Sequence, residues 1–172
     1  VGFYAAGIVL IVAAVFLAKD LRNYVFFTLA GTAVALLMLL LVLIIGKEAG
    51  GAKRWIEVAG ITIQPSEIAK TALVLLLALY MSIFQSKITD KKSTKNSFVY
   101  GVLLPMIPIA VICGLVYLEK HNSGMIILGA IGLSVMFIGG SRKSWLIGMG
   151  IVCILIFAVL MFSTGHGMER IT

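Results

Sequence analysis

The stretch PSEIAKTALVLLLALYMSIFQS, residues 65–86, decides how the chain folds. Its uncharged part covers only residues 71–86, whereas a helix that crosses a bilayer needs about 20 residues. The helix reaches that length if it begins near Pro65, because proline fits the first helical position, where its missing N–H has no partner to lose. Glu67 and Lys70 then lie in the first two turns of a membrane span.

Other long uncharged stretches surround this helix. The chain of 172 residues is 61% hydrophobic and only 12% charged, about half the charged fraction of a soluble domain. Transmembrane β-strands would show segments of about 10 residues with alternating polarity, a pattern that this chain lacks. The sequence therefore predicts an all-α, polytopic membrane helix bundle: a single transmembrane domain over 1–172, with six transmembrane helices near 2–18, 24–45, 65–86, 97–118, 123–140 and 144–163.

The charged connectors alternate in composition along the chain. One set holds eight Lys or Arg and two acids, and the other holds six Lys or Arg and five acids. Basic connectors stay on the cytoplasmic side, so we expect a cytoplasmic loop at 87–96 and an outer loop at 46–63. Both chain ends then lie outside the cytoplasm. Because the first residues carry neither Met nor a basic flank, we expect a fragment of a longer membrane protein.

Two prolines interrupt the predicted helix at 97–118. Pro105 and Pro108 each remove a backbone donor and clash with the preceding turn. A kink is expected, and in lipid the freed carbonyls must find partners inside the protein.

The net charge of +7 does not indicate nucleic-acid binding, because the basic residues sit in short gaps between spans. Cys113 and Cys153 lie inside apolar runs without CxxC spacing, as small packing residues do. With His121 and His166 as the two histidines, the spacing assembles no metal cluster.

The segment GAKRWIEVAGITIQPSEIAK, residues 51–70, concentrates charge beside this apolar helix. Glu67 would occupy the third helical position, near exposed N–H groups, and Lys70 would share its face. Such a pair faces the protein interior or a wet cavity, so either a structural ion pair or a functional site fits. Lys53, Arg54 and Trp55 fit an interface anchor equally well. Ser66 and Lys70 are too far apart for the Ser-x-x-Lys motif of penicillin-binding enzymes.

GAKRWI (51–56) and QPSEIAK (64–70) together resemble the signature of the SEDS family, the FtsW, RodA and SpoVE proteins of bacterial division and cell shape. The resemblance extends along the chain. KDLRNY (19–24) is similar to the turn before the signature loop, HNSGMIILGAIGLSVMFIGG (121–140) to the following family helix, and ERIT (169–172) to the start of the largest outer loop.

The resemblance implies a ten-span protein of the bacterial cytoplasmic membrane. Such proteins are peptidoglycan glycosyltransferases that polymerise lipid II. Their partners are a class B penicillin-binding protein and other membrane proteins of the divisome or elongasome. The motif then implies a substrate site in which basic groups meet the lipid diphosphate and a pair lines the central cavity; its residues are Lys53, Arg54, Trp55, Gln64, Ser66, Glu67 and Lys70. No cofactor is implied, and a divalent cation stays open as an alternative.

Two departures from the family pattern stand out. The chain has EKHNSG (119–124) where many relatives carry a Pro-Asp-Leu-Gly element. The catalytic Asp that the resemblance implies lies beyond Thr172, so we expect this fragment alone to be inactive.

Three other functions stay open: a lipid II flippase, a non-catalytic scaffold for a transpeptidase, and half of an inverted-repeat transporter. The SG and MFIGG elements favour FtsW over RodA, without deciding between division, elongation and sporulation.

Overall fold

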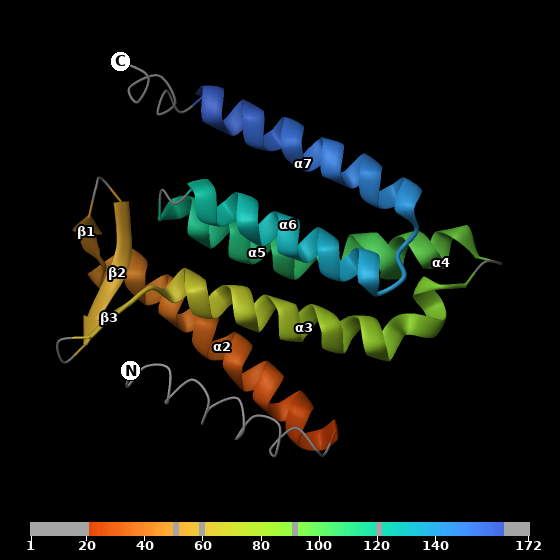
Figure 1. Ribbon diagram of the computed structural model, residues 1–172, viewed down its shortest axis with the longest axis horizontal. Helices are drawn as coiled ribbons and strands as arrows, with labels where there is room; N and C mark the ends of the chain where they lie inside the picture. The colour runs from red at the N-terminus through yellow and green to blue at the C-terminus, as the bar shows by residue number, and fades with distance from the viewer. Residues whose placement is uncertain (1–20, 50–51, 59–60, 91–92, 120–121, 164–172) are drawn as a thin grey trace, which may run out of the picture.

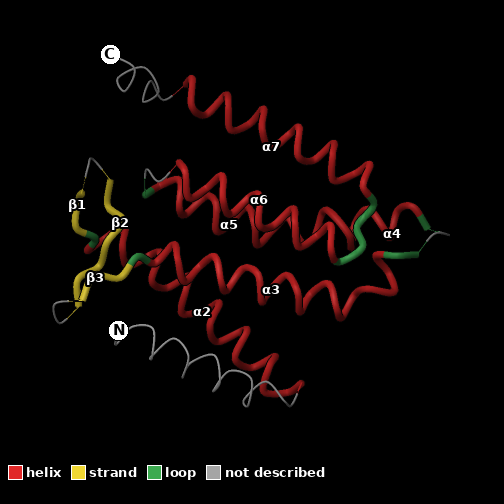
Figure 2. Tube along the Cα trace, in the orientation of Figure 1, coloured by secondary structure: helices red, strands yellow, loops and turns green. Residues whose placement is uncertain are grey.

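The computed structural model describes residues 21–49, 52–58, 61–90, 93–119 and 122–163 of the chain. Long helices make up most of this part, and a small sheet lies between the first two (Figures 1 and 2). The long helices are α2 (Leu21–Ile45), α3 (Pro65–Ile88), α5 (Leu104–Leu118), α6 (Asn122–Ile138) and α7 (Lys143–Ser163).

Helices α2, α3, α5 and α6 pack side by side and enclose an apolar core. Successive helices run in opposite directions, so the end of α2, the start of α3, the end of α5 and the start of α6 meet beside the sheet (Figure 1). Helix α7 packs against α6. The largest fully buried apolar side chains come from all four inner helices and include Leu39, Leu73, Leu77, Ile112, Leu128 and Met136.

Among the described residues, three helices are long and apolar enough to cross a membrane: Asn23–Ile45, Pro65–Ile88 and Thr94–Leu118. They agree with the predicted spans 24–45, 65–86 and 97–118. The predicted spans 123–140 and 144–163 also form helices, of which Ser123–Ile138 and Lys143–Ile156 count as shorter apolar segments. The predicted helix at 2–18 and the tail at 164–172 lie outside the described residues.

Large apolar side chains cover the outer faces of these helices. Such a continuous exposed apolar surface marks contact with lipid or with another protein. It is consistent with the predicted membrane bundle, and its strongly exposed members include Phe26, Ile44, Ile83, Ile138, Ile147, Ile154 and Val159.

The predicted outer loop 46–63 is a three-stranded antiparallel sheet rather than a loop. Its strands β1 (Lys47–Ala49), β2 (Ala52–Val58) and β3 (Ile61–Ile63) lie in the order β1-β2-β3. Lys47 faces Trp55 across the first pair and Ile56 faces Ile63 across the second. The all-α prediction describes the bundle but misses this sheet, whose sequence is rich in the β-branched and aromatic residues that favour strands.

The predicted loop 87–96 is shorter than expected. Helix α3 continues to Ile88, and α4 (Thr94–Phe98) begins directly after Ser93. The Ser93 hydroxyl caps this helix by accepting a hydrogen bond of 3.3 Å from the Asn96 N–H. From Thr94 the chain stays helical to Leu118, through a π-helical turn named η1 (Val99–Leu103) and then α5.

The π-helical turn lies directly before Pro105, the first of the two prolines at which a kink is predicted. Pro105 has no N–H to donate to the carbonyl of Gly101, four residues earlier. That carbonyl accepts a buried hydrogen bond of 2.6 Å from the Ser141 hydroxyl, which follows α6. A side chain from a neighbouring helix end therefore replaces the lost backbone donor.

A second carbonyl is freed by the π-helical turn itself. The Leu104 N–H donates to the Val99 carbonyl, five residues back, and so leaves the Tyr100 carbonyl without its α-helical partner. The Tyr80 hydroxyl of α3 donates to that carbonyl at 2.9 Å. Both freed groups are satisfied inside the protein, as an apolar surrounding requires.

The end of α6 places Ser141 for its contact. Gly140 has a φ of +91°, a left-handed conformation that glycine adopts without a steric cost. Its N–H donates to the Phe137 carbonyl, and the Ser141 N–H donates to the Met136 carbonyl. This is the Schellman pattern that closes a helix C-terminus, and it turns Ser141 back toward η1.

Replacing Ser141 by Ala should destabilise the protein by about 1–3 kcal/mol, since it leaves a buried carbonyl without a donor. Ser134→Ala is the matched control: that exposed hydroxyl donates to the Ala130 carbonyl inside its own helix. Thermal unfolding of both variants in detergent checks the prediction. Equal melting temperatures for the two would contradict it.

Candidate functional site

The polar residues singled out from the sequence gather at the start of α3, beside the sheet. Gln64 precedes the helix and Pro65 is its first residue. Glu67 is therefore the third residue, as predicted, and its N–H donates to the Gln64 carbonyl at 3.1 Å. The fixed φ of proline starts the helix here, which places an acid beside the positive end of the helix dipole.

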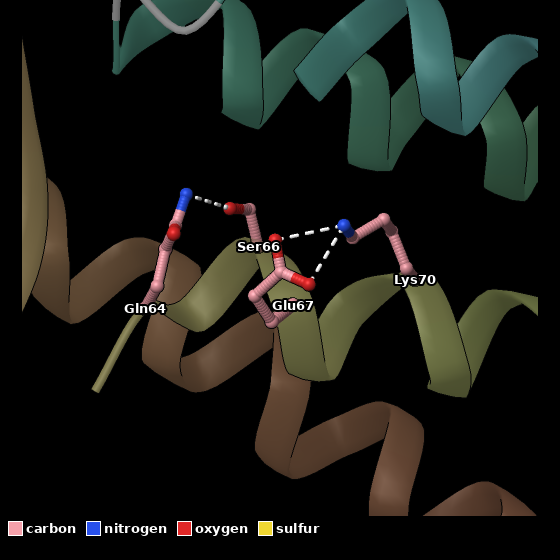
Figure 3. A network of polar contacts seen from close by, with 4 residues as sticks. All are labelled: Gln64, Ser66, Glu67 and Lys70. Atoms are coloured by element: carbon pink, nitrogen blue, oxygen red, sulfur yellow. Dashed lines mark hydrogen bonds and ion pairs between the residues drawn. The ribbon is translucent and has the colours of Figure 1, made fainter. Parts of the chain in front are cut away.

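Glu67 and Lys70 form the ion pair that their spacing predicts (Figure 3). The Lys70 ammonium lies 2.7 Å from each of the two carboxylate oxygens. The Glu67 side chain is 58% exposed and the Lys70 side chain 23%. The pair thus lies at the surface of the described bundle, and its contribution to stability is that of an exposed ion pair, about 0.2–1 kcal/mol.

Gln64 and Ser66 form a second polar contact on the same helix start. The Gln64 side-chain amide donates to the Ser66 hydroxyl at 3.0 Å (Figure 3). Ser66 is 1% exposed, so this hydroxyl serves the packing of the α3 start. Of the four residues in Figure 3, Ser66 is the buried one, and Gln64, Glu67 and Lys70 have surface open to a ligand.

The basic residues of the first motif lie on strand β2, and the strand separates them. Successive side chains of a strand point to opposite faces. Lys53, Trp55 and Glu57 are exposed on one face, whereas Arg54 is half-buried and Ile56 is buried on the other. Arg54 therefore points toward the helix ends, and Lys53 points away from them.

Glu119 joins this end of the bundle, although its sequence position marked it only as a connector charge. It directly follows α5 and is 1% exposed. Both carboxylate oxygens are buried without a hydrogen-bond partner, and so is the Arg54 Nε atom. Burial raises the pKa of Glu119 to about 7, and the Arg54 guanidinium partly offsets that rise.

Within the described ranges, no three His, Cys, Asp or Glu side chains come together as a metal site would require. The site that the structure does assemble consists of one arginine, one buried acid and one exposed ion pair. It can bind an anion and can place a buried, proton-accepting carboxylate behind it.

Comparisons with known proteins agree with the sequence motifs. A protein of Geobacter sp. (strain M18), named "Probable peptidoglycan glycosyltransferase FtsW", is 34% identical over 138 residues, covering 80% of this chain and 35% of the relative. A protein of the same name from Idiomarina loihiensis is 29% identical over 136 residues, covering 79% of this chain and 32% of the relative. The chain thus spans about a third of the length of these relatives.

Solved structures share the fold. The crystal structure of the rod shape determining protein RodA from Thermus thermophilus matches with a TM-score of 0.63 and 25% identity, over 88% of this chain and 48% of that chain. A second structure, titled as the coordination of polymerization and crosslinking by a peptidoglycan synthase complex, matches with a TM-score of 0.65 and 22% identity, over 98% of this chain and 48% of that chain.

The family profile of the FtsW, RodA and SpoVE cell cycle proteins matches residues 1–172, the whole chain. This chain belongs to that family.

Proposed function

We propose that the protein to which this chain contributes is a peptidoglycan glycosyltransferase that polymerises lipid II at the outer face of the bacterial cytoplasmic membrane. The names of the relatives support this activity. The observation that carries the proposal is the polar site beside the sheet: Arg54, Glu67 and Lys70 gather at one end of helices long enough to cross a membrane.

The site fits the head group of a lipid-linked diphosphate. Arg54 carries a planar fork of donors that matches phosphate oxygens, and it lies next to the ends of membrane-length helices, where the head group of a lipid substrate lies. Glu67 and Lys70 add an acceptor and a donor at the start of α3. Gln64 and Ser66 shape that helix start, while Trp55 and Lys53 present the opposite face of β2.

The proposal includes six spans in this chain and ten in the whole protein, and it includes a class B penicillin-binding protein as partner. The solved complex titled as joining polymerization and crosslinking supports that partner. The FtsW names of the two curated relatives favour a role in division.

Polymerisation is tested with the full-length protein, purified with its transpeptidase partner and given labelled lipid II. We expect glycan strands on a gel. A flippase would instead move lipid II across vesicles without forming strands. A scaffold would do neither, yet would still bind the partner. Either result contradicts the proposed activity.

The proposed orientation places the sheet outside the cytoplasm and the start of α4 inside. Thr62 and Thr94 are both exposed and lie near opposite ends of the bundle. In a background without other cysteines, an impermeant maleimide should label Thr62→Cys in intact cells, and Thr94→Cys only after permeabilisation. Labelling of Thr94→Cys from outside would refute the orientation.

A further inference from the structure

Two buried groups of opposite charge at this end of the bundle lack hydrogen-bond partners. They are the carboxylate of Glu119, through both oxygens, and the Nε of Arg54. Leaving a buried charged group unpaired costs several kcal/mol. Two such groups within electrostatic reach of each other therefore indicate a shared role.

The position of Glu119 makes its charge costly. It follows the last residue of α5, and its N–H donates to the Leu115 carbonyl at 3.3 Å. The C-terminus of a helix carries the negative end of the helix dipole, which disfavours a carboxylate. Local structure therefore does not explain an acid here, and a cation from another element must.

Arg54, on strand β2, is the cation whose charge acts on Glu119. The other charged groups of this region whose side chains the structure describes are engaged or point elsewhere. Lys70 and Glu67 of α3 bind each other. Lys53 and Glu57 are exposed on the opposite face of β2. Among the described residues, Arg54 is the charged group whose field acts on the Glu119 carboxylate.

We propose that Glu119 is a positioning residue for Arg54: its buried carboxylate attracts the Nε edge of the guanidinium, to which it makes no hydrogen bond in this structure, so that the outer Nη edge stays free for a phosphate. A guanidinium offers five donors in a rigid fork, and its two edges can serve two acceptors at once. The inference rests on the proposed role of Arg54 in binding the lipid diphosphate.

The burial of Glu119 distinguishes a positioning role for this residue from direct catalysis. Both oxygens of Glu119 are shielded from the surface, so they do not reach a substrate. Arg54 is half-exposed and can contact both the buried acid and a ligand. Glu119 therefore acts through Arg54.

Glu119→Gln tests the inference, because it keeps the shape and removes the charge. In the full-length protein with its partner, this variant should raise the KM for lipid II by about tenfold, the size of one charge-assisted hydrogen bond, and leave kcat close to wild type. Glu57→Gln, which removes an exposed acid from the other face of β2, is the matched control and should change neither.

A double-mutant cycle separates positioning from a general effect on the site. In an Arg54→Lys background, which has no Nε donor, Glu119→Gln should no longer change KM. The pH profile gives a second readout. Below pH about 7, where the raised pKa of Glu119 leaves the acid neutral, the wild-type KM should rise, and the Glu119→Gln KM should stay level.

The melting temperatures of the same four proteins keep the inference independent of the proposed function. Coupling between positions 54 and 119 in thermal unfolding requires no substrate. Absence of polymerisation by the wild type with thermal coupling present would reject the proposed function alone. Additive effects of the two substitutions, on KM or on melting temperature, would overturn the positioning role.

Discussion

Arg54→Lys is expected to lower the kcat/KM of lipid II polymerisation by about 10- to 100-fold, the loss of one or two charge-assisted hydrogen bonds. The charge stays, but an ammonium does not reproduce the planar fork. It also lacks the buried Nε donor that we propose Glu119 to position. The variant should therefore lose both the bidentate contact with phosphate and the interaction that orients the side chain at position 54.

Arg142→Lys is the matched control for this change. Arg142 lies at the other end of the bundle, just after α6, and donates one hydrogen bond of 3.3 Å to the Asp90 carbonyl. A lysine ammonium can make a single bond of this kind, so activity should stay near wild type. The measurement is lipid II polymerisation at equal amounts of folded protein. Undiminished activity of Arg54→Lys would reduce Arg54 to an anchor at the membrane interface.

Local rules in the sequence are sufficient to predict how α3 starts. Pro65 starts the helix, Glu67 follows at its third position, and Lys70 lies one turn further on the same face. Each relation depends on residues at most five positions apart, so helix geometry alone fixes it. The exposure of the pair was not predictable, because it depends on which neighbouring helices approach.

Non-local pairing explains what the sequence analysis missed. The segment 46–63 has the glycines and charges of a loop, and its sheet depends on the register between separate strands. That sheet then places Lys53 and Arg54 on opposite faces, although they are neighbours in sequence. Glu119 lies within electrostatic reach of Arg54 although the two are far apart in the sequence, and no local pattern marks that proximity.

The Glu67–Lys70 pair contributes little to the stability of the fold, and this changes how the activities of its variants should be interpreted. For a truly buried pair, removing one partner costs about 3–5 kcal/mol, and lost activity could then reflect lost folding. Here Glu67 is 58% exposed, and an exposed pair contributes about 0.2–1 kcal/mol. Glu67→Gln and Lys70→Met should therefore each fold almost normally, with melting temperatures within a few degrees of wild type.

The double variant Glu67→Gln with Lys70→Met should then fold like the wild type and polymerise lipid II at least about tenfold more slowly. It is neutral at both positions, so no unpaired charge remains to destabilise the helix start. It nevertheless lacks the acceptor and the donor that the pair offers at the start of α3. Folded protein is measured by melting temperature and polymerisation by glycan strand length and rate.

Ser82→Ala on the same helix, an exposed position more than three turns beyond Lys70, provides the control for α3 itself and should leave the rate unchanged. Two results would assign the pair a purely structural role. One is full polymerisation by the double variant. The other is a large loss of stability in either single variant that the double variant restores. Because an exposed ion pair contributes so little to stability, a loss of rate in well-folded protein has no structural explanation left and must come from contact with the substrate.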